Sequence, residues 1–125
     1  VICVGGGTQI NEAFKASGIA LTTHGPLGRE LDCIEHKQIA RDVLELNRDK
    51  LQDILAAKNV RASVIIPVLK IGTVICHVNG DTYIRTAYLG FEHLFVVTTQ
   101  DRVESKKAQY LDLPKIEVVG IEVEN

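Results

Sequence analysis

The chain begins with Val-Ile-Cys-Val-Gly-Gly-Gly-Thr-Gln-Ile-Asn-Glu-Ala-Phe, residues 1–14, and this stretch sets the expected fold class. Residues 1–4 are a short apolar run of the kind that a parallel sheet buries on both faces. Three glycines follow, and residues 8–17 then predict a helix, with Thr8 as its N-cap and Gly18 just past its end. The order of strand, glycine turn and helix is that of a βα unit, so the sequence predicts an α/β protein.

The rest of the chain continues this alternation. Apolar side chains keep helical spacing over residues 31–58, which predicts one long helix or two helices with a break near Asn47. A further helix, capped by Asp81, is expected to run through Leu89. The other expected strands are residues 19–22, 62–67, 72–78, 93–98 and 115–123. We therefore expect a mainly parallel sheet with helices on both faces.

The composition fits one folded domain, residues 1–125, with 46% hydrophobic and 24% charged residues. A net charge of −2 provides no basic surface, so nucleic acid is not an expected partner. No apolar run is long enough for a membrane span, and no secretory signal is recognisable, so a membrane is not expected either. The three cysteines match no disulfide or zinc pattern, which favours a cytoplasmic protein without a protein-bound metal. Because methionine is absent and Val1 falls inside an expected strand, we expect a segment to precede Val1.

Ligands of parallel α/β sheets collect where strands end and helices begin. Three loops are expected at that rim: residues 5–7, residues 77–81 and residues 98–101. Glycines have no side chains to keep an anion away from backbone N–H groups, and the following helix presents its positive end. Gly5, Gly6 and Gly7 therefore predict a site for phosphate or carboxylate. They are equally compatible with a tight turn that binds nothing, because neither the P-loop nor the dinucleotide-binding spacing is present.

Two other positions have both a functional and a structural interpretation. Arg29 follows a glycine-proline loop, from which its guanidinium can clamp a carboxylate or pair with Glu30 or Asp32. Asn79 can donate to a substrate while Asp81 orients a lysine or a metal ion, or the pair can simply cap a helix. The four histidines show no metal-ligand spacing, and Cys33 with His36 makes only a weak metal pattern.

Taken in order, these segments resemble the amino-acid kinase family. Residues 1–14 look like its second glycine loop, and residues 27–32 (Leu-Gly-Arg-Glu-Leu-Asp) look like its Gly-Leu-Arg-Val-Thr-Asp substrate loop. Residues 77–82 (His-Val-Asn-Gly-Asp-Thr) resemble the Asn-x-Asn-Ala-Asp segment of the acetylglutamate kinase branch, and residues 89–98 resemble the strand that leads to the nucleotide. The resemblance covers residues 1–102.

The resemblance implies a three-layer αβα sandwich, and a reaction in which ATP, with Mg²⁺, phosphorylates a carboxylate or phosphate of a small acidic metabolite, as in amino-acid biosynthesis. Gly5, Gly6 and Gly7 would hold the transferring phosphoryl or the acidic group of the substrate. Arg29 and Asn79 would bind the substrate, and Asp81 would be the catalytic residue that orients lysines. The nucleotide would lie at Thr98, Thr99 and Asp101. Family members usually self-associate, so a homo-oligomer is expected.

The sequence also departs from the family pattern. No strand with the family's first lysine precedes Val1, the second lysine is not identifiable, and Thr99 and Arg102 replace the Asp and Gly of the nucleotide loop. Phosphoryl transfer depends on such cations. Two alternatives therefore stay open: a non-catalytic relative that binds an acidic metabolite and regulates or scaffolds a partner, and an unrelated small α/β enzyme that binds an anionic substrate at residues 5–7.

Overall fold

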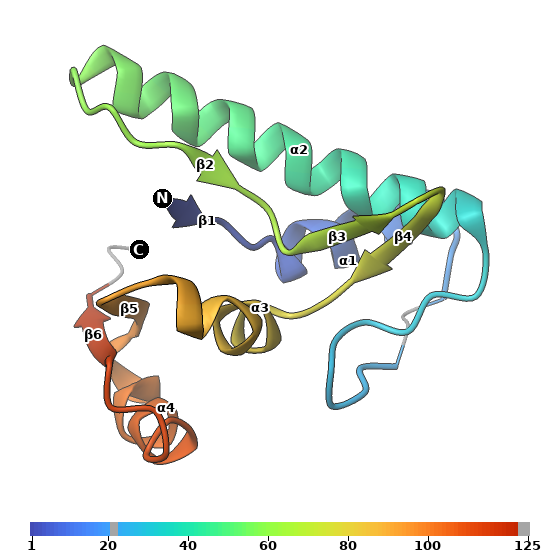
Figure 1. Cartoon of the computed structure of the whole chain (residues 1–125). Coiled ribbons are helices and arrows are strands. Elements are labelled where there is room, and N and C mark those ends of the chain that lie inside the picture. The colour runs from blue at the N-terminus through green and yellow to red at the C-terminus, as the bar shows by residue number, and fades with distance from the viewer. Residues whose placement is uncertain (21–22, 123–125) are drawn as a thin grey trace. The chain divides into compact units, whose positions relative to one another are not determined.

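The protein is described by a computed structural model over residues 1–20 and 23–122. Helices and strands are mixed along the chain, as the α/β expectation requires, and they are shown in Figure 1. The chain forms two compact units, one of residues 1–83 and one that begins at Ile84. The elements in order are β1 (Ile2–Cys3), α1 (Gly7–Ala16), α2 (Ile34–Ala57), β2 (Val64–Ile65), β3 (Val68–Ile71), β4 (Val74–His77), α3 (Gly80–Ala87), the 3₁₀ turn η1 (Tyr88–Gly90), β5 (Leu94–Thr99), the 3₁₀ turn η2 (Gln100–Arg102), α4 (Val103–Gln109) and β6 (Ile116–Ile121).

The helix predicted after the glycines is α1, and its beginning differs from the expectation in one respect. Gly6 occupies the N-cap position with φ −177° and ψ 37°, and no side chain caps the helix. Thr8 lies inside the first turn, so the prediction that Thr8 is the N-cap is wrong. The reason is that the third glycine already has helical geometry, which moves the start of the helix back to Gly7. Gly18 follows the end of the helix with φ +69°, as its position predicted.

The long helix of the first unit is continuous, which decides between the two alternatives that the sequence left open. α2 passes through Asn47 without a break. Ala40 and Leu44 on one side of α2 pack with Ile10 and Phe14 of α1, and these four residues form the buried core. Phe14 is fully buried. Burying such a side chain contributes roughly 1.5–3 kcal/mol, so the α1–α2 contact contributes substantially to the stability of this unit.

The strands of the first unit form two separate pairs. β1 and β2 pair in parallel, with Ile2 opposite Val64. The side chain of Gln52 in α2 donates to the carbonyl of Ala62 (2.8 Å) and accepts from the amide of Val64 (3.1 Å), which satisfies the other edge of β2. Figure 1 shows α2 running beside β2 and the β3–β4 pair.

β3 and β4 form an antiparallel hairpin. The strand expected at residues 72–78 is only the second half of this hairpin, because Gly72 has φ +60° and forms the turn. Within residues 1–20 and 23–122 the strands thus form three two-stranded sheets, of which two are parallel. A three-layer sandwich stays a prediction. The strand expected at residues 19–22 falls partly outside the described residues, and residues 19–20 have no regular structure.

The second unit is built on the longer parallel pair. β5 and β6 pair from Leu94 opposite Ile116 to Thr99 opposite Ile121, which confirms both predicted strands over most of their length. The polar stretch between them contains α4, a helix that the sequence did not predict. Leu94, Val103 and Tyr110 are buried in this unit. Gly120 provides room, because a Cβ there would lie 2.7 Å from a methyl group of Val103.

Candidate functional site

The three glycines of the turn before α1 have different surroundings. A Cβ added at Gly6 would lie 2.5 Å from the side-chain nitrogen Nδ2 of Asn47 and 3.2 Å from a methyl group of Leu44. Close packing against α2 therefore accounts for glycine at this position. A Cβ added at Gly5 or Gly7 would meet no atom within 4 Å. Asn47 also donates to the carbonyl of Gly5 (3.2 Å), which ties the turn to α2. Packing therefore explains one glycine and leaves Gly5 and Gly7 without a steric reason.

Arg29 lies beside this turn. Its Nη2 donates to the carbonyl of Gly7 (3.3 Å) and its Nη1 to Oδ1 of Asn11 (2.8 Å), and its guanidinium is 5.7 Å from the ring centroid of Phe14. The loop that carries Arg29 is closed by a bridge between His24 and Arg29. Partial burial lowers the pKa of Arg29. The ordinary pKa of a guanidinium is so high that Arg29 remains a cation at neutral pH.

The Arg29 loop is seated on the connection between β4 and α3. Gly28 has φ +154°, and a Cβ there would lie 2.8 Å from the carbonyl oxygen of His77 and 2.9 Å from the amide nitrogen of Asn79. The amide of Asn79 donates to the carbonyl of Leu27 (3.0 Å). Only glycine fits such a close approach of two backbones. The structure thus links the glycine turn to Arg29, and the Arg29 loop to Asn79. We call Gly5, Gly6, Gly7, Arg29 and Asn79 the glycine-arginine cluster.

Asn79, and not Asp81, caps α3. Oδ1 of Asn79 accepts from the amide of Thr82 (2.6 Å), the contact that an N-cap residue makes. The expectation that Asp81 is the cap is therefore wrong, because α3 begins at Gly80 and places Asp81 in the first helical turn. Since Oδ1 of Asn79 is engaged, a contact of this side chain with an anion would come from its amide nitrogen. Asp81 is half-buried in the first turn of α3 and belongs to the same unit as the cluster.

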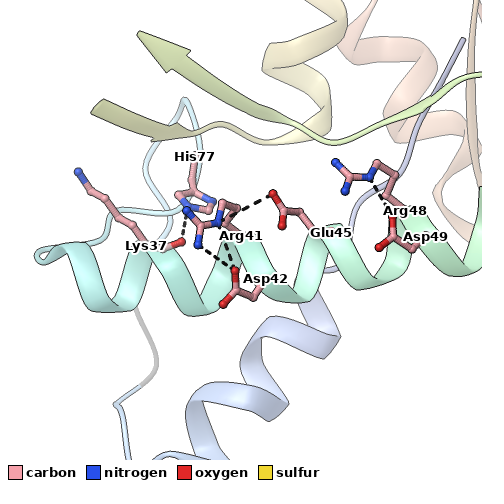
Figure 2. Close-up of polar contacts among 7 residues, drawn as sticks. All are labelled: Lys37, Arg41, Asp42, Glu45, Arg48, Asp49 and His77. Carbon is pink, nitrogen blue, oxygen red and sulfur yellow. Dashed lines mark hydrogen bonds and ion pairs between the residues drawn. The ribbon is translucent and has the colours of Figure 1, made fainter. Parts of the chain in front are cut away.

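His77 is the residue of this region that sequence reasoning missed as a site residue. Its Nε2 lies 2.9 Å from the carbonyl oxygen of Lys37 on α2, as Figure 2 shows. Burial lowers the pKa of His77, and the positive charges of Lys37, Arg29 and Arg41 lower it further, against the opposing effect of the bond to Lys37. A neutral imidazole at neutral pH therefore donates Nε2–H to that carbonyl. In the sequence, only the position of His77 could have indicated a role in the site, because His77 ends an apolar strand two residues before Asn79.

The predicted nucleotide residues lie in the second unit. Thr98 and Thr99 end β5, and Asp101 lies in the 3₁₀ turn that follows. A hydrogen bond from the Thr99 side chain lowers the pKa of Asp101. These three residues thus form a local turn at the carboxyl end of a parallel strand, which is the place where the sequence predicted them. Their relation to a nucleotide stays a prediction.

Among residues 1–20 and 23–122, no three or more His, Cys, Asp or Glu side chains gather in a way that would hold a metal ion. In that same part of the chain, no helix combines the length and the apolar character that crossing a bilayer requires.

Known proteins give no further guidance. No protein-family model matches the chain, and neither does any curated protein or solved structure.

Proposed function

We propose that the glycine-arginine cluster binds the carboxylate or phosphate of a small acidic metabolite, and that the protein transfers the γ-phosphoryl group of ATP to it, as an acetylglutamate kinase-like member of the amino-acid kinase family. The observation that carries the proposal is the position of the Arg29 guanidinium beside Gly7, at the first turn of α1. A cation thus contacts the first turn of α1 at Gly7, near the positive end of the helix, and packing requires glycine neither there nor at Gly5.

Each residue of the cluster has a role in this proposal. The amides of Gly5 and Gly7 donate to the anion, and Gly6 keeps the turn close to α2. Arg29 supplies the positive charge, and its bond to Asn11 fixes the plane of the guanidinium. Asn79 donates from its amide nitrogen. Asp81 acts as the carboxylate that orients cationic groups near the transferring phosphoryl.

ATP and Mg²⁺ belong to the same proposal. Mg²⁺ is often bound through one or two carboxylates together with the phosphates of the substrate, and Asp81 in the first turn of α3 is the carboxylate that suits this role. The ion would neutralise charge on the phosphates when bound. Thr98, Thr99 and Asp101 are proposed to contact the nucleotide, within a three-layer αβα sandwich whose oligomer is built from copies of this chain.

A second candidate function is anion binding without phosphoryl transfer. It is favoured by the two hydrogen bonds that tie Arg29 to Asn11 and to the carbonyl of Gly7, because a guanidinium held by the protein can fix a regulatory ligand as well as a reacting one. Both candidates, and an unrelated α/β enzyme acting on an anion, share the glycine-arginine cluster. Only the kinase candidate requires that the bound metabolite becomes phosphorylated by ATP.

The test separates binding from chemistry. Inorganic phosphate and a small dicarboxylate such as glutarate are titrated into the whole chain by calorimetry, and phosphate release or transfer from ATP with Mg²⁺ is then measured with the same compounds. Arg29→Ala is expected to weaken anion binding about tenfold or more, which corresponds to about 1.4 kcal/mol. Arg48→Ala is the matched control, because Arg48 lies on the exposed side of α2 in an ion pair with Asp49. If the two variants bind the anions with equal affinity, the proposal that Arg29 forms part of an anion-binding site is wrong.

The glycines provide a second test that is independent of charge. Gly7→Ala adds a methyl group in open space and favours the helix, so the variant should be as stable as the original chain or up to about 1 kcal/mol more stable. The same methyl group would stand between an anion and the amides, so binding should be weaker. Gly6→Ala should instead lower stability, because its Cβ meets α2. If Gly7→Ala binds phosphate and glutarate unchanged, the turn is a structural turn only.

A further inference from the structure

His77 joins two parts of the first unit that hold the glycine-arginine cluster. Its side chain bonds to Lys37 on α2, while its backbone carbonyl lies under Gly28 in the Arg29 loop. α2 also holds the other side of the cluster, because Asn47 donates to Gly5. A single helix therefore positions both the glycine turn and the seat of Arg29, the first through Asn47 and the second through His77.

The charges around the His77 ring are positive. The positive charges of Lys37 and Arg41 on α2 and of Arg29 in the loop all disfavour a proton on this ring. Strand β3 places Val68 opposite His77, which adds no charge. Figure 2 shows that Arg41 has carboxylate partners of its own on α2, Asp42 at 3.0 Å and Glu45 at 3.9 Å. A proton on His77 would thus add a further positive charge near these cations, one of which is Arg29, the residue proposed to bind the anion.

We propose that His77 is a positioning residue of the glycine-arginine cluster, and that its proton and an anion bound beside Arg29 bind cooperatively. This inference rests on the proposed function, since it requires an anion at Arg29. The argument is electrostatic: the anion cancels the repulsion that Arg29 exerts on a protonated imidazole, and the proton in turn adds attraction for the anion. By linkage the two effects are equal in free energy. Anion affinity should therefore rise as pH falls through the titration of His77.

The experiment follows the histidine titrations of the whole chain by NMR between about pH 5 and about pH 8, the range in which imidazole titrates. Sulfate is the probe, because it stays divalent throughout that range, and sodium chloride at equal ionic strength is the reference. Sulfate is expected to raise the pKa of His77 by about 0.3 or more, equivalent to about a twofold change in affinity. The sodium chloride reference corrects for the general effect of ionic strength on all histidine signals.

Two variants separate a charge effect from a purely structural one. His77→Gln keeps an amide that can donate to the carbonyl of Lys37 but cannot take up a proton, so its sulfate affinity should not depend on the protonation of residue 77. Arg29→Gln removes the cation, so the pKa of His77 should rise without sulfate and should no longer respond to it. Loss of affinity in His77→Gln with an unchanged pH profile would assign His77 a structural role and overturn the coupling.

The outcomes for the two proposals are distinguishable. If sulfate shifts the amide signals of Gly5–Gly7 but leaves the titration of His77 unchanged, the coupling is wrong and the anion site stands. If sulfate shifts neither, both the site and the coupling are rejected. If it shifts both, and Arg29→Gln abolishes both responses, both are supported.

Discussion

Each of the two units contains one parallel pair of strands, but the two pairs differ in length and in what holds them in place. In the first unit β1 and β2 pair over only two residues each, and their positions depend on α2 and on side chains that bond to the backbone. In the second unit β5 and β6 pair over six residues each, and α4 packs on them. Phe95 and Val97 of β5 are 58% and 61% exposed. Regular strand pairing thus organises the second unit, whereas the first unit combines the apolar contact between α1 and α2 with specific polar contacts and contains the glycine-arginine cluster.

The largest expected effect contrasts one aromatic residue from each unit. Phe14→Ala should destabilise the chain by about 3–5 kcal/mol, because it removes the fully buried side chain between α1 and α2. Phe95→Ala removes the same atoms from an exposed position, where it also stacks on His93, and should cost far less. Urea unfolding, combined with hydrogen exchange resolved by residue, measures both. Similar losses in the two variants would contradict the contrast between the units.

A smaller effect is expected at Gly28. Gly28→Ala should cost about 2–3 kcal/mol, because the backbone conformation at φ +154° is strained for alanine and the methyl group would meet backbone atoms of the β4–α3 connection. The same variant should displace Arg29 and weaken anion binding. Gly90→Ala is the matched control in the second unit, since its Cβ would meet no atom within 4 Å. Thermal unfolding and phosphate titration of both variants would show whether the loop depends on this contact.

The smallest effect concerns pH. Burial and three cations lower the pKa of His77 below its ordinary value of 6.5, so the unfolded chain takes up this proton more readily than the folded chain. The contribution of His77 to stability is therefore complete above pH 6.5 and is lost as pH falls through that value toward the folded-state pKa. His77→Gln should flatten this part of the stability profile, measured by urea unfolding at several pH values. His93→Gln, in the second unit, should leave it in place.

The sequence predicted the elements whose apolar pattern is unambiguous. Residues 1–4 and 8–17 correspond to β1 and α1, and residues 31–58 contain α2, because strand runs and helical stripes reflect burial directly. The sequence missed β3 because Lys70 interrupts its short apolar run and Pro67 seemed to end the strand before it. It missed α4 because that helix buries only Val103 and is otherwise polar. A short polar helix has no periodic signal that differs from a loop.

The candidate site was predictable in its residue types but not in its contacts. Glycines before a helix and an arginine after a glycine loop were recognisable, and the structure places Arg29 next to Gly7. The role of Gly28 was not recognisable, because it depends on a backbone approach to His77 and Asn79, residues about fifty positions away in the chain. The sequence offered both Asp81 and Asn79 as caps of α3 and could not choose between them, because both residue types favour that position, and the structure shows Asn79.

The amide of Gln52 has a consequence for how the protein avoids unwanted association. By offering one donor and one acceptor to the outer edge of β2, a single side chain imitates the hydrogen-bonding pattern of a neighbouring strand. Exposed strand edges are templates on which other polypeptides can assemble into aggregates. On the β2 side, Gln52 already occupies this donor and this acceptor, so a strand that added there would have to displace it.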